Sequence, residues 1–238
     1  MIDAQMKGKL TSFFEPLWPD KTPKEPIISK TRTMLIDAGT GLGIALIERT
    51  PLLKLPYVFA TELGHLQTSI NMMESPQHDS EFHLTQYISD MMYDGKQAPE
   101  FEDIASGRGI PVVYQYYYNQ ITGKKIPLNE INAEEIASHA KNGDRIAYKT
   151  MLTHHQFLMR AAKAVVTSLS CENVLLALDN QVKNDWFVQR EKDRLADEFF
   201  NFIRPDWMKK IHVYTQRKLQ NFTLRGTVWL ANTRLNKK

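Results

Sequence analysis

The spacing of apolar residues divides the chain into predicted strands and helices. Residues 33–50 contain two short β-like runs, TMLIDAG and GIALIERT, on either side of a glycine-rich turn, and this pattern predicts a β-hairpin. Apolar residues three and four positions apart predict helices over 80–92, around 112–117, over 133–142 and over 144–169. The first half of the chain is therefore expected to be a hairpin followed by helices.

The second half alternates between the two kinds of element. The run NVLLALD predicts a buried strand, and a helix is expected over about 185–203, before Pro205. The run IHVYT predicts another strand, and 224–235 a last amphipathic helix. These elements predict an α/β fold with a mixed sheet flanked by helices.

A proline-rich segment near the start predicts a boundary. Residues 14–30, FEPLWPDKTPKEPIISK, carry four prolines and mixed charge, which disfavours a helix or a central strand and indicates a connecting loop. We therefore assign 1–32 to a leading segment and 33–238 to the main domain.

Composition narrows the class of protein. The 238 residues are 42% hydrophobic and 24% charged, which is typical of a globular domain, and the net charge of +3 gives little support for nucleic-acid binding. The single Cys171 excludes an internal disulfide and favours a reducing compartment, so we expect a cytoplasmic protein. The first 15 residues lack the apolar core of a signal peptide, and no apolar run reaches 18 residues, so no membrane association is expected.

The turn of the predicted hairpin is a candidate phosphate site. In the run Asp37-Ala38-Gly39-Thr40-Gly41-Leu42-Gly43, consecutive backbone N–H groups are free to approach an anion because the glycines lack a Cβ. Asp37 is able to hold a magnesium-bound water beside such phosphates. The alternatives are a ligand-free turn and an Asp37 that only stabilises it.

Two further segments carry carboxylates. Glu62 and His65, three residues apart, suit hydrogen bonding to adjacent hydroxyls of a polyol, although such pairs are often plain surface groups. Glu102 precedes Ser106-Gly107-Arg108-Gly109 and is also explained as a carboxylate in the first turn of a helix.

Taken in this order, the three segments resemble the bacterial-type glucokinases of the sugar kinase, heat-shock protein and actin superfamily. The resemblance runs from about Asp3 to Leu235. It implies that 33–238 is the ribonuclease-H-like large lobe of such a kinase, and that 1–32 is a remnant of its small lobe with a connecting loop. It implies that Gly39, Thr40, Gly41 and Gly43 bind phosphate, and that Glu62, His65 and Glu102 bind the hydroxyls of glucose or a related hexose. ATP and Mg²⁺ are the implied cofactors, with Asp37 on the metal, and the implied reaction is the first step of glycolysis. No cysteine cluster follows His65, which favours the zinc-free branch.

The same resemblance implies that Asp3 is the catalytic base. It lies 36 residues before Gly39, the family spacing, but Ile2 replaces the usual preceding Asn. The alternative is a solvated residue near a chain end.

The sequence departs from the family in two ways. It starts where the catalytic aspartate is expected, so we expect the small lobe and its first phosphate loop to be missing or left out by an incomplete gene model. Leu178-Asp179 also replaces the Gly-Gly of the nucleotide-binding turn. Three functions stay open: a glucokinase, a degenerate sugar-binding relative and a pure interaction module. We expect turnover at least about a thousandfold below an intact homologue. We also expect Leu224, Val228 and Trp229 to be exposed, and either a homodimer or another chain that supplies the small lobe.

Overall fold

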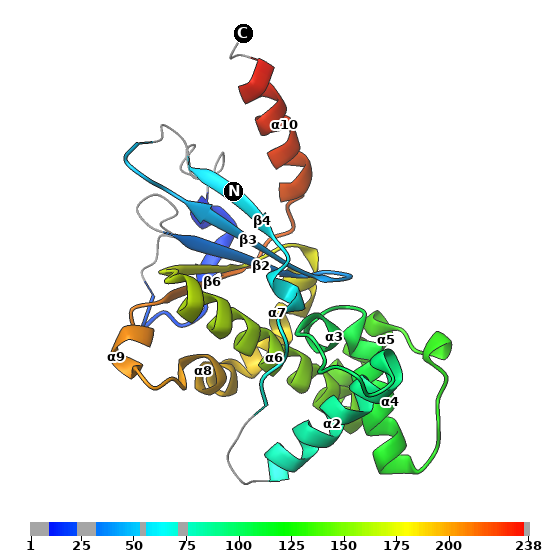
Figure 1. Ribbon diagram of the computed structural model, residues 1–238. Helices are drawn as coiled ribbons and strands as arrows, with labels where there is room; N and C mark the ends of the chain where they lie inside the picture. Colours follow the sequence, from blue (N-terminus) through cyan, green and yellow to red (C-terminus); the bar gives the residue numbers. More distant parts are fainter. Residues whose placement is uncertain (1–9, 23–31, 53–55, 71–75, 236–238) are drawn as a thin grey trace.

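The computed structural model describes residues 10–22, 32–52, 56–70 and 76–235. Within these ranges, one mixed sheet has the strand order β1-β6-β5-β2-β3-β4. The strands are β1 (Phe14–Pro16), β2 (Thr33–Ala38), β3 (Leu42–Glu48), β4 (Tyr57–Thr61), β5 (Asn173–Leu176) and β6 (His212–Gln216). The α/β class and the mixed sheet predicted from the sequence are confirmed (Figure 1).

The predicted hairpin is the central feature of the sheet. Strands β2 and β3 pair antiparallel from Thr33↔Ile47 to Ala38↔Leu42, which leaves residues 39–41 as the turn. Strand β2 also pairs in parallel with β5, and β5 with β6. The turn therefore lies at the carboxyl ends of the parallel strands β2, β5 and β6.

Most helices lie on one face of the sheet and extend beyond it, whereas α10 begins on the opposite face (Figure 1). Their bounds are α2 (Pro76–Tyr93), α3 (Glu102–Ala105), α4 (Gly109–Thr122), α5 (Ala133–Lys141), α6 (Arg145–Leu169), α7 (Asp179–Arg190), α8 (Lys192–Phe200), α9 (Pro205–Met208) and α10 (Phe222–Leu235). Short 3-10 helices are η1 (Leu10–Ser12), η2 (Leu63–His65) and η3 (Leu128–Glu130). The prediction of a single helix over 185–203 is wrong, because α7 already starts at Asp179 and a break at Glu191 separates α7 from α8.

Alternation along the strands creates two cores. Met34, Val174 and Val213 belong to the larger core, which also contains apolar residues of α6 and α8. Leu175 and Tyr214 belong to the smaller core on the opposite face, together with residues of η1 and α10. Burial of these side chains stabilises the sheet by about 1.5–3 kcal/mol for each large apolar residue.

The proline-rich segment is not only a loop. Strand β1 pairs antiparallel with β6 at the edge of the sheet, where a proline is tolerated because no further strand needs its N–H. Phe14, Leu17 and Trp18 are buried in the two cores. A boundary at residue 32 therefore does not separate 14–18 from the rest of the domain. A small-lobe origin of 1–32 stays a prediction.

Apolar side chains remain exposed along α10, which extends away from the sheet (Figure 1). Leu224 and Val228 are 61% and 52% exposed, as expected, whereas Trp229 is half-buried against the smaller core. No helix among the described residues is long and apolar enough to cross a membrane.

Candidate functional site

The hairpin turn is anchored by the segment that carries Glu102. The buried carboxylate of Glu102 accepts a hydrogen bond from the Leu42 N–H at 2.7 Å, and its other oxygen accepts from Arg108. The Gly107 N–H donates to the Gly39 carbonyl at 2.7 Å. Glu102, expected to bind a sugar hydroxyl, therefore also fixes the position of the turn.

The segment of Glu62 and His65 lies against the same strand. A Cβ on Gly64 would lie 2.2 Å from the Leu42 carbonyl oxygen, so only glycine allows this approach. The Phe101 N–H donates to the Leu66 carbonyl at 2.9 Å, and Gln67 forms a β-bridge with Glu100. Residues 62–67 and 100–102 are thus held together beside the turn.

His65 lies between two carboxylates. Its Nδ1 is 2.5 Å from Glu100 Oε2, and its Nε2 is 3.6 Å from Glu62 Oε2. The Glu62 side chain is 90% exposed, and that of His65 is 47% exposed. Sequence reasoning missed Glu100, whose only signal is that it lies two residues before Glu102.

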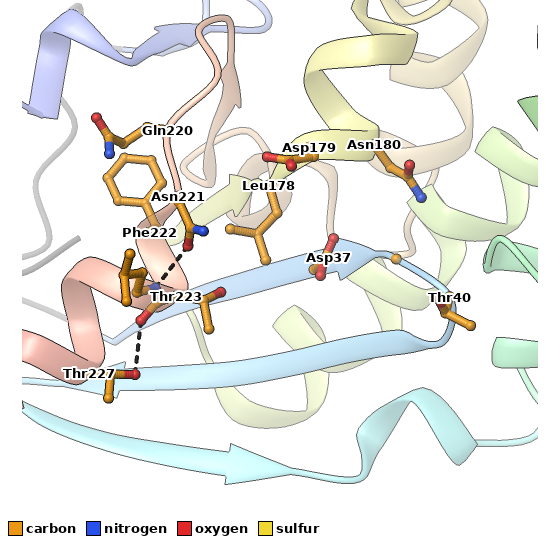
Figure 2. Close-up of a pocket in the computed structure, with 12 residues that line it drawn as sticks. Asp37, Thr40, Leu178, Asp179, Asn180, Gln220, Asn221, Phe222, Thr223 and Thr227 are labelled. Carbon is orange, nitrogen blue, oxygen red and sulfur yellow. Dashed lines mark hydrogen bonds between the residues drawn. The ribbon is translucent and has the colours of Figure 1, made fainter.

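On its other side, the turn borders a pocket of about 600 Å³ (Figure 2). Three parts of the chain line it: the end of β2 with the turn, the start of α7, and the start of α10. The lining residues are Asp37, Gly39, Thr40, Leu178, Asp179, Asn180, Gln220, Asn221, Phe222, Thr223, Leu224 and Thr227. This volume lies within the range of about 300–1,000 Å³ typical of small-molecule sites.

Leu178 has a backbone conformation that favours glycine. Its φ of 72° and ψ of −172° fall in a region that L-residues rarely occupy, at a cost of about 1–3 kcal/mol. The side chain also packs partly against the smaller core. The substitution noted in the sequence thus leaves the chain in a glycine-like path, and the pocket beside it stays open.

The electrostatics of the pocket centre on Asp37. Burial, and secondarily the nearby Asp179 carboxylate, raise the pKa of Asp37 to about 6. No cluster of three or more His, Cys, Asp or Glu side chains able to hold a metal occurs in the described part of the chain. Because Mg²⁺ commonly binds through one or two carboxylates together with substrate phosphates, this acidic pair fits a magnesium ion that arrives with a nucleotide.

The structure thus brings most of the sequence-predicted site residues to one region. Glu62, His65 and Glu102 lie on one side of the turn, and Asp37, Gly39 and Thr40 border the pocket on the other. Gly41 faces Glu102 instead, since a Cβ on it would lie 2.6 Å from Glu102 Oε2, and Gly43 does not line the pocket. Asp3, the expected base, lies outside the described residues.

Comparison with known proteins identifies the family. The family model for glucokinase matches residues 22–177, more than half of the chain. Two curated proteins of Trichomonas vaginalis, "Probable glucokinase 2" and "Glucokinase 1", are each 46% identical over 237 residues. Those matches span 100% of this chain but 63% of each relative's length.

A solved structure shows the same relationship. The crystal structure of glucokinase from Balamuthia mandrillaris in complex with glucose is 32% identical, with a TM-score of 0.89. The match covers 97% of this chain and 62% of that one. On the strength of the matched residues and the shared fold, the chain belongs to the glucokinase family.

Proposed function

We propose that this chain serves ATP-dependent phosphorylation of glucose at its 6-hydroxyl. The observation that carries the proposal is the position of the β2–β3 turn. Asp37, Gly39 and Thr40 border the pocket. On the other side, Leu42 is bonded to Glu102 and lies against Gly64. A single rigid turn therefore joins a candidate nucleotide site to a candidate sugar site.

On the nucleotide side, the backbone supplies most of the recognition. The turn offers N–H groups, and the N-termini of α7 and α10 border the same pocket, where the helix dipoles favour negative charge. Asp37 would hold a Mg²⁺ ion that arrives with the nucleotide, and that ion would supply neutralisation of the phosphate charge.

On the sugar side, we assign Glu62, His65 and Glu102 to the glucose hydroxyls. Carboxylate oxygens accept hydrogen bonds from hydroxyls, and the exposed ring edge of His65 offers a further polar contact. Glu100, on Nδ1 of His65, orients the ring so that Nε2 remains available. Several convergent polar groups of this kind select a polyol over an apolar ligand.

The transfer itself needs a base for the sugar hydroxyl. We assign this role to Asp3, whose carboxylate takes the proton as the 6-oxygen bonds to the γ-phosphorus. The bond from that phosphorus to the β–γ bridging oxygen breaks, and ADP leaves. Alignment and charge neutralisation provide most of the rate enhancement in such reactions.

The alternative of a degenerate sugar-binding or interaction module is not favoured. The 46% identity to the two glucokinases extends along the whole chain, and the pocket next to Leu178 is open. Low turnover, a homodimer, a partner chain and a cytoplasmic location remain predictions.

Calorimetric titration with glucose tests the sugar half of the proposal. We expect saturable binding that weakens at least about tenfold, or about 1.4 kcal/mol, in Glu62→Gln and in His65→Ala. Glu135→Gln, on the exposed side of α5, is the matched control and should bind as the unaltered chain does. Absence of glucose binding, or equal loss in the control, would contradict the assignment.

A further inference from the structure

Gln216, the last residue of β6, makes two hydrogen bonds with a fully buried side chain. Its Oε1 accepts from the Leu178 N–H at 2.8 Å, and its Nε2 donates to the Lys218 carbonyl at 2.8 Å. The residue has 0% exposure. A buried amide bonded at both ends holds its partners in place, because losing either bond leaves a polar group unpaired.

The two bonded peptides lead into the two walls of the pocket. Leu178 directly precedes α7, whose Asp179 and Asn180 line one wall. Lys218 precedes residues 220–224 and Thr227, which line the other wall. Figure 2 shows Asp179 and Asn180 apart from Asn221 and Thr223, with the hairpin that carries Asp37 and Thr40 running past both groups. Gln216 thus ties together the chain segments that face each other across the pocket.

The wall at α7 is also tied to the turn. Asn180 Nδ2 donates to the Ala38 carbonyl at 2.7 Å, and the Ala177 N–H donates to the Ile36 carbonyl at 3.0 Å. Leu178 lies between these two attachments in its glycine-like conformation. Its N–H needs a fixed acceptor to keep that conformation, and Gln216 provides one.

We propose that Gln216 is a positioning residue for the nucleotide site. Its amide, here called the Gln216 clasp, sets the separation of the α7 and α10 walls and keeps Leu178 in the left-handed region, so that the backbone meets the nucleotide in a preformed geometry. The inference rests on the proposed function, because it takes the pocket to be the nucleotide site.

Four proteins test the clasp in the full chain: the unaltered protein, Gln216→Met, Leu178→Gly and the double variant. We expect Gln216→Met to weaken binding of the magnesium complex of a non-hydrolysable ATP analogue at least tenfold, while glucose affinity changes less than twofold. In the Leu178→Gly background, the same substitution should weaken nucleotide binding less than threefold, because glycine adopts the required φ unaided.

The matched control is Gln115→Met. Gln115 also joins two partners, Tyr87 and Ile126, but lies on α4 and does not line the pocket. We expect it to lower thermal stability and to leave nucleotide affinity within twofold. Equal weakening of nucleotide binding in both Met variants, or parallel loss of nucleotide and glucose binding in Gln216→Met, would overturn the positioning role.

Amide hydrogen exchange at Leu178 provides a readout that needs no nucleotide. Exchange should be slow in the unaltered chain and in Gln216→Glu, which keeps an acceptor, and at least tenfold faster in Gln216→Met. Equal exchange in all three would overturn the clasp.

If the unaltered chain binds no nucleotide, the proposed function fails, and the exchange result still decides whether the clasp exists. If Gln216→Met does not fold, Gln216→Glu should lose nucleotide affinity while Leu178 stays protected, and unchanged affinity would refute the clasp.

Discussion

Replacing Glu102 separates its structural role from its proposed role in sugar binding. Its carboxylate accepts hydrogen bonds from the Leu42 N–H and from Arg108. Glu102→Ala removes both interactions, Glu102→Gln leaves one oxygen to serve two donors, and Arg108→Ala removes only the second. The three variants therefore form a graded series.

The magnitudes follow from burial. The bond to Leu42 is buried and charge-assisted, and such bonds contribute about 1.5–3 kcal/mol. The Arg108 side chain is 61% exposed, so solvent limits its ion pair to no more than about 1 kcal/mol. For a chain of this size, each kcal/mol lowers the melting temperature by about 2–4 °C. We expect losses of about 3–16 °C for Glu102→Ala, less for Glu102→Gln, and no more than about 4 °C for Arg108→Ala.

Differential scanning calorimetry without ligand measures the series, and a second scan at saturating glucose measures the sugar contribution. Glucose should raise the melting temperature of Arg108→Ala by more than it raises that of either Glu102 variant, because at one ligand concentration a tighter ligand stabilises the folded state more. The reasoning is refuted if Arg108→Ala is as damaging as Glu102→Ala, or if Glu102→Gln melts like the unaltered chain.

Three other outcomes follow from the structure. Burial lowers the pKa of His154 to about 3 and that of His155 to about 4, so both stay neutral in the folded chain, and the free energy of unfolding should fall as pH drops from about 6.5 towards 4. Melting curves of a variant with Gln at both positions should show a smaller fall, and an unchanged fall would contradict this role of the two histidines. Because the pKa of Asp37 is raised to about 6, affinity for the magnesium–nucleotide complex should weaken as pH falls through 6, and titrations of Asp37→Asn should show only the nucleotide's own pH dependence. Gly64→Ala should destabilise the chain by about 1–3 kcal/mol in urea unfolding, whereas Gly226→Ala, in an open helical position, should stabilise it by about 0.5–1 kcal/mol. Equal effects would contradict the close approach of Gly64 to the Leu42 carbonyl.

The sequence predicted those parts of the fold in which local pattern and tertiary structure agree. The hairpin at 33–50 was predictable because apolar alternation flanks a glycine-rich turn. The start of α7 was not, because DNQVKND has no apolar period. Strand β1 was missed because its residues lie among prolines and become a strand only by pairing with β6.

The candidate site shows the same division. Glu62, His65 and Glu102 were found because their order resembles a known family. Glu100 and Gln216 were missed because a lone glutamate and a lone glutamine carry no pattern, and the partners His65 and Leu178 lie 35 and 38 residues away in the chain. In the sequence Leu178 is a departure from the family's Gly-Gly, and only the backbone angles show its glycine-like path.

Formation of glucose 6-phosphate tests the central claim most directly. Phosphorus NMR during long incubation of the 238-residue chain with glucose, ATP and Mg²⁺ detects even slow turnover. We expect steady formation of glucose 6-phosphate and ADP that requires glucose and is lost in Asp3→Asn. Absence of product when calorimetry shows both ligands bound, or equal rates in Asp3→Asn, would contradict the central claim.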